Sequence, residues 1–238
     1  MSINYCFTIY CYLNITDKIV TALSVFSIIF LPGFRSEYKM DKPVSAACLR
    51  NQEPIAAALK TLLPNATRLL EIGSGTGQHA VFCAKELPHI IWQPSDLAQH
   101  HDGMKLWIDE AALSNVLAPL VLDVDQDWPL IEVDHVFTAN TVHYIAYESV
   151  VNMFRGISQL LAIGSLFMLY GPVNVNGEYT SEGNAQLDQW LKTCVNPLAG
   201  IKDLADIESL AREHDLQLID NLAMPANNRL LVFTKKSA

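Results

Sequence analysis

The stretch LLEIGSGTGQHA, Leu69–Ala80, decides the fold predicted for this chain of 238 residues. It reads as an apolar strand that runs into a glycine-rich turn and then into a helix. In open α/β sheets, ligands bind at the carboxyl ends of the strands, and the first turn of this kind is a usual place. Gly73, Gly75 and Gly77 permit positive φ and let the backbone approach a ligand without obstruction by a Cβ atom. The stretch therefore predicts a ligand-binding turn in an α/β domain.

The rest of the chain continues this alternation of strand and helix. From Thr67 onward, short apolar runs alternate with segments whose apolar residues recur at i, i+3, i+4 and i+7, beginning at Ala80, Met104, Val150 and Leu187. Such an order is typical of helices that cover the faces of a mainly parallel sheet. The strand candidates are Arg68–Ile72, Ile90–Gln93, Pro119–Leu122, His135–Ala139, Ser165–Tyr170, Gln217–Leu222 and Leu230–Thr234.

The last two strand candidates are joined by Ala223–Arg229 alone, which is too short for a helical crossover. Two strands joined so closely form an antiparallel hairpin. We therefore expect an α/β, Rossmann-like domain: a seven-stranded, mostly parallel sheet that ends in an antiparallel hairpin and carries helices on both faces.

Glu71 distinguishes between two classes of cofactor. A dinucleotide fingerprint reads G-x-G-x-x-G and would need glycine at Gln78, whereas this turn reads G-x-G-x-G. A carboxylate two residues before the first glycine repels a pyrophosphate, but it suits a ligand with an ammonium group and a sulfonium charge. S-adenosylmethionine carries both, so the turn favours this cofactor over NAD.

Two further carboxylates end the next two strand candidates. Asp96 follows Gly77 by nineteen positions, where its carboxylate can accept from both ribose hydroxyls of a nucleoside. Asp123 can accept from an adenine amino group while the Val124 amide faces the ring. Simpler alternatives are open: the glycine turn as a tight connection, and either aspartate as a helix N-cap. The expected cofactor-binding residues are Glu71, Gly73, Ser74, Gly75, Gly77, Asp96, Leu97, Asp123, Val124 and Asn140.

From about Met40 to Lys236, the sequence resembles the class I S-adenosylmethionine-dependent methyltransferases, and within them the poorly characterised methyltransferase-like protein 26 family. This resemblance implies the seven-stranded methyltransferase fold and the cofactor S-adenosylmethionine more firmly than it implies any substrate. It is carried by the blocks RNQEPI at Arg50–Ile55, EIGSGTGQHA at Glu71–Ala80, WQPSD at Trp92–Asp96, NTVHYI at Asn140–Ile145, YGPV at Tyr170–Val173 and MPANN at Met224–Asn228.

Two residues are candidates for the chemical step. Methyl transfer from a sulfonium is an in-line displacement in which positioning supplies much of the acceleration, so a site needs no strong acid or base. His143 follows the fourth strand candidate and could deprotonate or hydrogen-bond the acceptor; the alternative is a structural histidine that caps the next helix. Tyr170 ends the fifth strand candidate and could orient the acceptor; the alternative is core packing.

Four further residues are candidates for substrate binding. Arg50 and Asn51 precede a helix that Pro54 is expected to start, and that helix could lie over the cofactor as a lid, with Arg50 binding a substrate carboxylate. A solvated arginine is the alternative. Asn227 and Asn228 lie in the turn between the last two strands, where asparagine accepts left-handed geometry, so turn chemistry competes with substrate contact.

No metal site is expected. The adjacent His100 and His101 lack the i, i+4 placement of metal ligands and are interpreted as a solvated helix start. The five cysteines form no CxxC pair and no regular spacing, which favours a reducing cytoplasm over a disulfide framework. Cys83 lies on the apolar stripe of its helix and is expected to be a buried thiol.

Composition limits the classes of partner. A content of 50% hydrophobic and 17% charged residues excludes a disordered chain. With 16 Lys and Arg against 25 Asp and Glu, the formal charge of −9 argues against broad capture of nucleic acid or anionic lipid. A small-molecule substrate is expected, and no feature of the sequence indicates an oligomeric state.

The first 39 residues differ from the rest and form a separate N-terminal extension to a methyltransferase-like domain at 40–238. Their apolar run Ile19–Leu31 has thirteen residues, which is short for a membrane span of about 20. Three alternatives are open: an upstream start that is not used, with translation beginning at Met40, a membrane-associating extension, or a packed accessory element.

The sequence thus predicts an S-adenosylmethionine-dependent methyltransferase that acts on a small molecule, with a protein side chain as the alternative acceptor. Two rivals remain. A non-catalytic module could keep the cofactor pocket for sensing or interaction, because the sequence shows no obligatory base. A nicotinamide-dependent oxidoreductase is disfavoured by Glu71 and by Gln78 in place of glycine.

Overall fold

The computed structural model of the chain describes residues 41–65 and 68–237. The extension predicted at 1–39 lies outside the described residues. None of the helices in the described part combines the length and the apolar character that crossing a bilayer requires.

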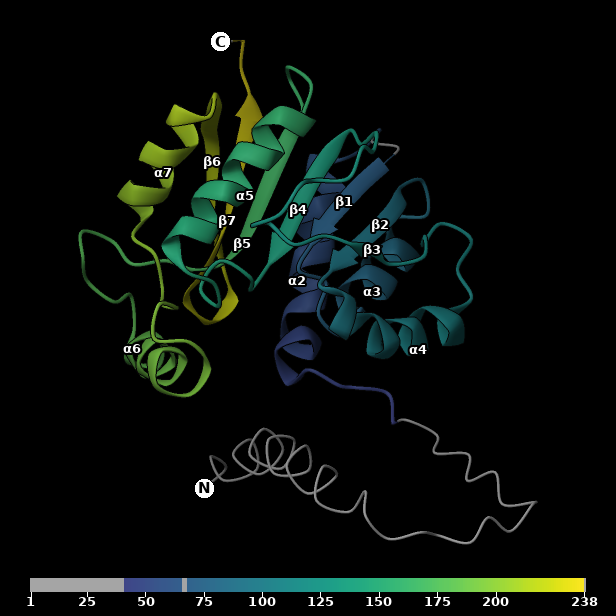
Figure 1. Cartoon of the computed structure of the whole chain (residues 1–238), viewed down its shortest axis with the longest axis horizontal. Coiled ribbons are helices and arrows are strands. Elements are labelled where there is room, and N and C mark those ends of the chain that lie inside the picture. Colours follow the sequence, from purple (N-terminus) through teal and green to yellow (C-terminus); the bar gives the residue numbers. More distant parts are fainter. Residues whose placement is uncertain (1–40, 66–67, 238) are drawn as a thin grey trace, which may run out of the picture. The chain divides into compact units, whose positions relative to one another are not determined.

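Strands of the described residues form one seven-stranded sheet in the order β3-β2-β1-β4-β5-β7-β6 (Figure 1). The first five pair in parallel, and β7 runs antiparallel to both β5 and β6, so the predicted sheet with its terminal hairpin is confirmed. The order reverses between β1 and β4, which places the ligand crevice of such a sheet outside their carboxyl ends. The strands are β1 (Arg68–Ile72), β2 (Ile91–Asp96), β3 (Leu120–Val121), β4 (His135–Ala139), β5 (Leu166–Pro172), β6 (Leu216–Met224) and β7 (Asn228–Lys235).

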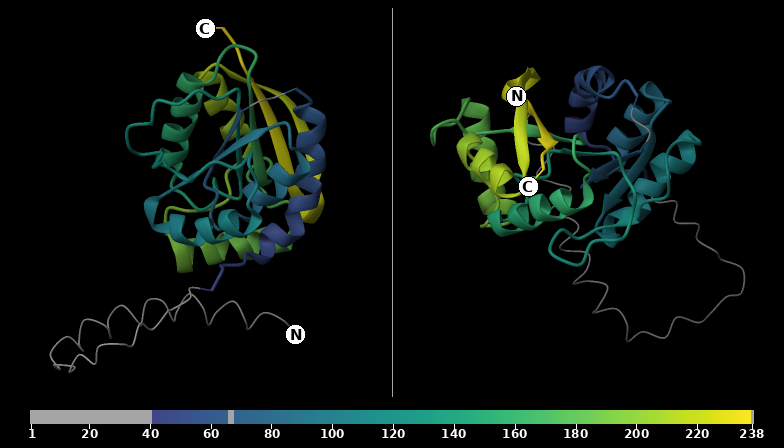
Figure 2. Two further views of the ribbon diagram at one scale, coloured as in Figure 1. Left: turned by 90° about the vertical axis from the view of Figure 1, so that its right-hand side faces the viewer. Right: turned by 90° about the horizontal axis from the view of Figure 1, so that it is seen from above.

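Helices cover both faces of the sheet, as expected (Figure 2). One face packs against α2 and α3, with α4 beside them, and the other packs against α5 and α7. The helices are α2 (Ala46–Leu62), α3 (Gln78–Glu86), α4 (His101–Ala111), α5 (Tyr147–Leu160), α6 (Glu182–Trp190) and α7 (Leu204–Glu213), with short turns η1 (Ala98–His100), η2 (Leu191–Val195) and η3 (Pro225–Asn227).

Helix α2 begins eight residues before the expected start. Ser45 is its N-cap, and the Ser45 hydroxyl accepts from the Cys48 amide at 3.4 Å. Pro54 lies inside the helix, so the prediction that Pro54 starts it is wrong. A proline there removes one backbone hydrogen bond, and the complete burial of Ile55 and Leu59 against the sheet compensates for that loss.

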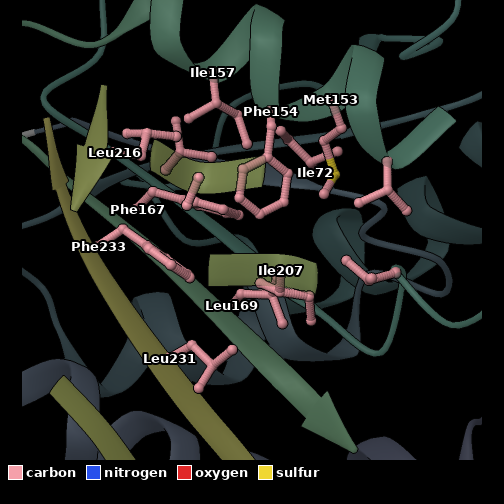
Figure 3. Packing of buried hydrophobic residues seen from close by; sticks show 14 of the residues in the cluster. Ile72, Met153, Phe154, Ile157, Phe167, Leu169, Ile207, Leu216, Leu231 and Phe233 are labelled. Atoms are coloured by element: carbon pink, nitrogen blue, oxygen red, sulfur yellow. The ribbon is translucent and has the colours of Figure 1, made fainter. Parts of the chain in front are cut away.

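The two faces have separate apolar cores. On the α5 and α7 face, Phe154 meets Phe167 and Phe233 edge-on, with ring centroids 5.3 and 5.9 Å apart (Figure 3). On the α2 and α3 face, Trp92 meets Phe137 edge-on at 6.1 Å. Both arrangements are preferred by aromatic quadrupoles. Cys83 is fully buried in the second core, as predicted.

Helix α6 departs from its predicted stripe. Its buried positions are the polar residues Asn184 and Asp188, and Cys194, expected on the apolar face, is exposed in the π-helical turn η2. The expectation that this stripe covers a face of the sheet is therefore wrong. The Asp188 carboxylate accepts from the Ile201 amide and from the Tyr179 hydroxyl, so hydrogen bonds rather than apolar burial fix α6.

Candidate active site

The glycine turn lies between β1 and α3, with Gly73, Gly75 and Gly77 at φ of 71°, 55° and 84°. A Cβ atom on Gly73 would lie 2.4 Å from Thr141 Oγ1, and one on Gly77 would lie 2.7 Å from Met104 Cγ. At Gly75 a Cβ atom would meet nothing within 4 Å. The outer glycines are therefore required by packing within the chain, whereas the middle one leaves open space at the surface of the turn.

Hydrogen bonds hold the turn against the end of β2. The Ser74 amide donates to the Ser95 carbonyl at 3.0 Å, and the Ser95 amide donates to the Ser74 hydroxyl at 3.1 Å. The Gly75 amide donates to Asp96 Oδ2 at 2.7 Å. The Ser74 and Ser95 hydroxyls also donate to the Glu71 carbonyl, so Glu71, Ser74, Gly75 and Asp96, four of the predicted cofactor-binding residues, lie together. Hydrogen bonds from both Ser74 and Gly75 thus attach the turn to the end of β2.

Asp96 is the centre of this arrangement. Its Oδ1 accepts from the Leu97 amide at 2.7 Å and lies 2.7 Å from His100 Nδ1. Burial raises the pKa of Asp96, but the hydrogen bonds from His100, Gly75 and Leu97 outweigh it and leave the pKa lowered. Because Oδ2 has only one donor, a ligand hydroxyl can still bind there.

The two adjacent histidines both contact Asp96, which sequence reasoning missed. His101 is buried, and its Nε2 lies 3.0 Å from the Asp96 carbonyl oxygen. Hydrogen bonding to Asp96 raises the pKa of His100. The interpretation of this pair as a solvated helix start is wrong for His101 and incomplete for His100. The spacing of four between Asp96 and His100, at a helix start, is the signal that could have revealed the contact.

Glu71 lies inside the layer between the sheet and helices α2 and α3. Its side chain is 1% exposed, and Trp92 Nε1 donates to Glu71 Oε2 at 2.8 Å. Burial raises the pKa of Glu71 to about 7, against the lowering effect of the bonds from Trp92 and Ser74. The same layer holds His79, whose Nδ1 lies 3.9 Å from Cys48 Sγ and whose Nε2 has no partner among the described residues. A carboxyl group with this pKa is ready to ionise when a cation arrives.

Asp123, Val124 and Asn140 lie at neighbouring strand ends and are not drawn into the turn. Asp123 Oδ1 accepts from the Asp125 amide at 3.0 Å and so closes its own loop. Val124 packs against the α5 and α7 core. Asn140 has φ of 58°, and its amide donates to the Tyr170 carbonyl at 2.9 Å. The roles predicted for these three residues toward a cofactor stay predictions.

His143 follows β4 and is 4% exposed. Burial and the Lys202 cation lower its pKa to about 4, although the Asp188 carboxylate acts in the opposite direction. The alternative role as a helix cap is wrong, because Ala146 is the N-cap of α5 and no side chain caps it. Its imidazole is therefore neutral at neutral pH and can accept a hydrogen bond. The sequence around His143 did not indicate its charged neighbours, because Asp188 and Lys202 lie 45 and 59 residues further along the chain.

Tyr170 lies within β5, which continues two residues beyond the predicted end. Its side chain is 1% exposed in the α2 and α3 core, and burial raises its pKa to about 12, while the nearby Asn228 and Arg50 lower it. Arg50 is exposed on α2 and Asn51 is buried on the same helix. Asn228 lies close to Tyr170 across the β5–β7 pair, because Tyr170 pairs with Leu230 and Pro172 with Asn228.

The two asparagines between the last strands differ in conformation. Asn227 has φ of 57° in η3, as the turn interpretation predicts, and is exposed. Asn228 is in extended conformation at the start of β7, so left-handed geometry is wrong for Asn228. Its Nδ2 donates to the Pro225 carbonyl at 3.0 Å. In the described part of the chain, no three His, Cys, Asp or Glu side chains converge as a metal site would require.

Two surface hollows lie at the opposite end of the parallel strands from the glycine turn. One of about 710 Å³ is lined by Arg68, Ile91 and the loop before β4, and one of about 480 Å³ is lined by the end of α2 and the turn before β5. Both lie near the amino ends of the parallel strands, whereas the glycine turn and the carboxylates lie at the carboxyl ends. Neither hollow holds a residue predicted for the site.

Solved structures of methyltransferases share this fold. The chain is similar to the mitomycin 7-O-methyltransferase MmcR (16% identity, TM-score 0.71, 80% of this chain and 54% of that one) and to an O-methyltransferase family protein from Burkholderia thailandensis (15%, 0.71, 81% and 58%). It is also similar to NcsB1, an O-methyltransferase from neocarzinostatin biosynthesis solved with S-adenosylmethionine and 2-hydroxy-5-methyl naphthoic acid (14%, 0.67, 79% and 54%).

These similarities establish the Rossmann-like methyltransferase fold. The chain spans little more than half the length of each of the three structures. A family model described as a protein of unknown function, DUF938, matches residues 42–235. The chain belongs to the DUF938 family.

Proposed function

We propose that the chain is an S-adenosylmethionine-dependent methyltransferase that acts on a small molecule, with its methyltransferase domain at 40–238. One observation carries this proposal: Gly75, which has open space where a Cβ atom would lie, donates its amide to Asp96 Oδ2 at the carboxyl ends of β1 and β2. A nucleoside placed there would find backbone amides, no obstructing Cβ atom and a carboxylate with room for a hydroxyl. The resemblance to methyltransferase-like protein 26 and the fold shared with known methyltransferases support it.

The residues present fit this cofactor. Asp96 would accept from the ribose hydroxyls through Oδ2, and Glu71, whose pKa is about 7, would ionise beside the ammonium group. Asp123, Val124 and Asn140 would line the adenine and methionine ends of the site. The bound cofactor supplies a methyl group on a sulfonium. His143 would stay neutral and accept a hydrogen bond from the methyl acceptor.

Calorimetric titration of the full chain with S-adenosylmethionine, S-adenosylhomocysteine and NAD tests the cofactor. We expect micromolar binding of the first two and none of NAD. Asp96→Ala and Gly75→Arg should each weaken binding at least tenfold, which corresponds to about 1.4 kcal/mol or more. Gly164→Arg is the matched control, because Gly164 also has positive φ and open space but lies in the turn before β5, at the amino end of that strand. An affinity for S-adenosylmethionine equal to that of the wild-type chain in both site variants would refute the assignment.

Turnover distinguishes an enzyme from a binding module. Methyl-labelled S-adenosylmethionine and a small-molecule cell extract should give a labelled product with the wild-type chain, and His143→Gln should lower its rate while leaving S-adenosylhomocysteine affinity intact. Binding without any labelled product would favour the non-catalytic module. Binding of NAD alone would favour the oxidoreductase.

A further inference from the structure

The segment Asp41–Ser45, which leads into α2, has no regular secondary structure and crosses from α4 to the start of α3 (Figure 1). We call this segment the strap. Trp107 Nε1 on α4 donates to the Pro43 carbonyl at 2.6 Å. Lys42 Nζ lies 2.5 Å from Glu110 Oε1 and 3.8 Å from the centroid of the Trp107 ring. Three contacts therefore attach this end of the strap to α4.

The other end of the strap is joined to the glycine turn through one side chain. Gln78 Oε1 accepts from the Ser45 amide and, at 3.0 Å, from the Thr76 hydroxyl. Gln78 is the first residue of α3, and Thr76 directly follows Gly75, where the cofactor is proposed to bind. A movement of the strap away from α3 therefore breaks a hydrogen bond at the side of the proposed cofactor site.

The start of α4 packs against both the strap and the glycine turn. A Cβ atom on Gly103 would lie 2.8 Å from Pro43 Cγ, and one on Gly77 would lie 2.7 Å from Met104 Cγ. Neither pair leaves room for an added methyl group, so the backbone of each glycine is in direct contact with its partner. The strap and the turn thus share one packing partner, which begins five residues after Asp96.

Two buried polar atoms beside the strap have no partner. Gln78 Nε2 and His79 Nε2 make no hydrogen bond within residues 41–65 and 68–237. Ser45 bonds to the same Gln78 side chain, and Cys48 Sγ in the first turn of α2 lies 3.9 Å from His79 Nδ1. A buried polar atom without a partner costs free energy, and contact with water would regain it. Movement of the strap and of this first turn away from α3 is therefore less costly than the bonds to Gln78 alone imply.

We propose that the strap Asp41–Ser45 opens to admit the cofactor and closes beside the glycine turn to retain it. The inference rests on the proposed function and adds a conformational step to the entry and the release of S-adenosylmethionine. The strap suits this role because it is held by a few separate contacts at its two ends, while Val44 between them is 61% exposed. Segments with few buried contacts open at a lower cost than the helices and strands of a core.

A reversible crosslink tests the strap in the full chain. A Cβ atom on Gly103 would lie 3.9 Å from Pro43 Cβ, which is a usual separation for a disulfide. The double variant Pro43→Cys with Gly103→Cys should form this bond on oxidation with diamide and lose it in dithiothreitol, and peptide mass spectrometry identifies the pair. Rates are then measured with radiolabelled S-adenosylhomocysteine. Oxidation before the ligand is added should slow its association at least tenfold, and oxidation after binding should slow its dissociation at least tenfold.

The order of the two steps separates closure from distortion. A crosslink that only distorts the site would weaken binding and speed release in both orders, and this result would overturn the inference. Unchanged rates in the oxidised chain, or failure of the two thiols to pair, would also overturn it. Reduction should restore both rates.

A second variant tests the strap without a crosslink. Lys42→Gln removes the contacts with Glu110 and with the Trp107 ring, so S-adenosylhomocysteine should dissociate at least threefold faster. Lys105→Gln is the matched control, because Lys105 pairs with Asp102 within α4, at 3.6 Å. Equal rates in the two variants would contradict the inference. Binding to the wild-type chain is measured first: its absence refutes the proposed function, whereas binding with rates that ignore the crosslink refutes the strap alone.

Discussion

His100 Nδ1 lies 2.7 Å from Asp96 Oδ1, and this contact ties the start of α4 to the end of β2. The other carboxylate oxygen of Asp96 accepts from the Gly75 amide. One carboxylate therefore joins the glycine turn, the strand end and the next helix before any ligand arrives. Such preorganisation lowers the entropic cost of binding, because the Asp96 carboxylate is already held in place beside the glycine turn.

Loss of the His100 contact should change stability in a pH-dependent way. Hydrogen bonding to Asp96 raises the pKa of His100, so its stabilisation is fully present below pH 6.5 and is lost as pH rises through the folded pKa. The His100 side chain is 45% exposed, and solvent screening limits the effect to less than about 1 kcal/mol. Urea unfolding of His100→Ala should show this loss at pH 5.5 and almost none at pH 8.5. An equal loss at both values would exclude an ionic contribution.

Glu71→Gln should stabilise the free protein and weaken cofactor binding. Burial raises the pKa of Glu71 from 4.5 to about 7, so the folded chain resists ionisation and its stability falls as pH rises between these values. Glutamine removes a penalty of about 3 kcal/mol above pH 7, while it keeps an acceptor for Trp92. Urea unfolding at pH 8 should show the gain, and at pH 4.5 the two proteins should be alike. A destabilised variant at pH 8 would mean that the carboxylate is held ionised.

Two buried histidines should destabilise the fold in acid. Burial lowers the pKa of His79 and of His143 to about 4, so each binds a proton in the unfolded chain from pH 6.5 but in the folded chain only near pH 4. Stability is present above pH 6.5 and lost as pH falls, by about 3 kcal/mol for each group. His143→Gln should remove about half of this loss in urea unfolding, whereas the exposed His89→Gln should not. An equal fall in stability between pH 7 and pH 4.5 in the wild-type chain and in His143→Gln would contradict the prediction.

The sheet could be predicted from the sequence because each strand is a local pattern. Apolar runs bounded by glycine, proline and acidic residues locate the strands, and short spacing fixes the final hairpin. The prediction for the edge strand β3, Pro119–Leu122, is one residue too long at each end: the strand has only Leu120 and Val121, and Val121 is 55% exposed. An edge strand is held by one neighbour, so its ends are not set by its own residues.

The missed features depend on partners far apart in the chain. Asn184 and Asp188 are buried on α6 because Tyr179, Ile201 and Thr180 supply hydrogen bonds, and an apolar periodicity does not contain that information. The start of α2 was missed because proline is a common first residue of helices, whereas here capping and burial override it. The glycine turn was recognised, but which glycine faces open space depends on residues 27 to 68 positions away.

Alanine substitutions in the turn should reveal that division between the glycines. Gly75→Ala incurs only left-handed backbone strain, about 1 to 2 kcal/mol, because nothing lies within 4 Å of the new methyl group. Gly73→Ala incurs the same strain and also places the methyl group 2.4 Å from Thr141 Oγ1, so it should cost at least about 1 kcal/mol more. The double variant Gly73→Ala with Thr141→Ala should recover part of the difference, because only the Cβ atom of residue 141, 3.1 Å away, remains near. Urea unfolding of the four proteins measures both effects. Equal stability of the two glycine variants would mean that the turn relaxes away from Thr141, and Gly73 would then be as open to a ligand as Gly75.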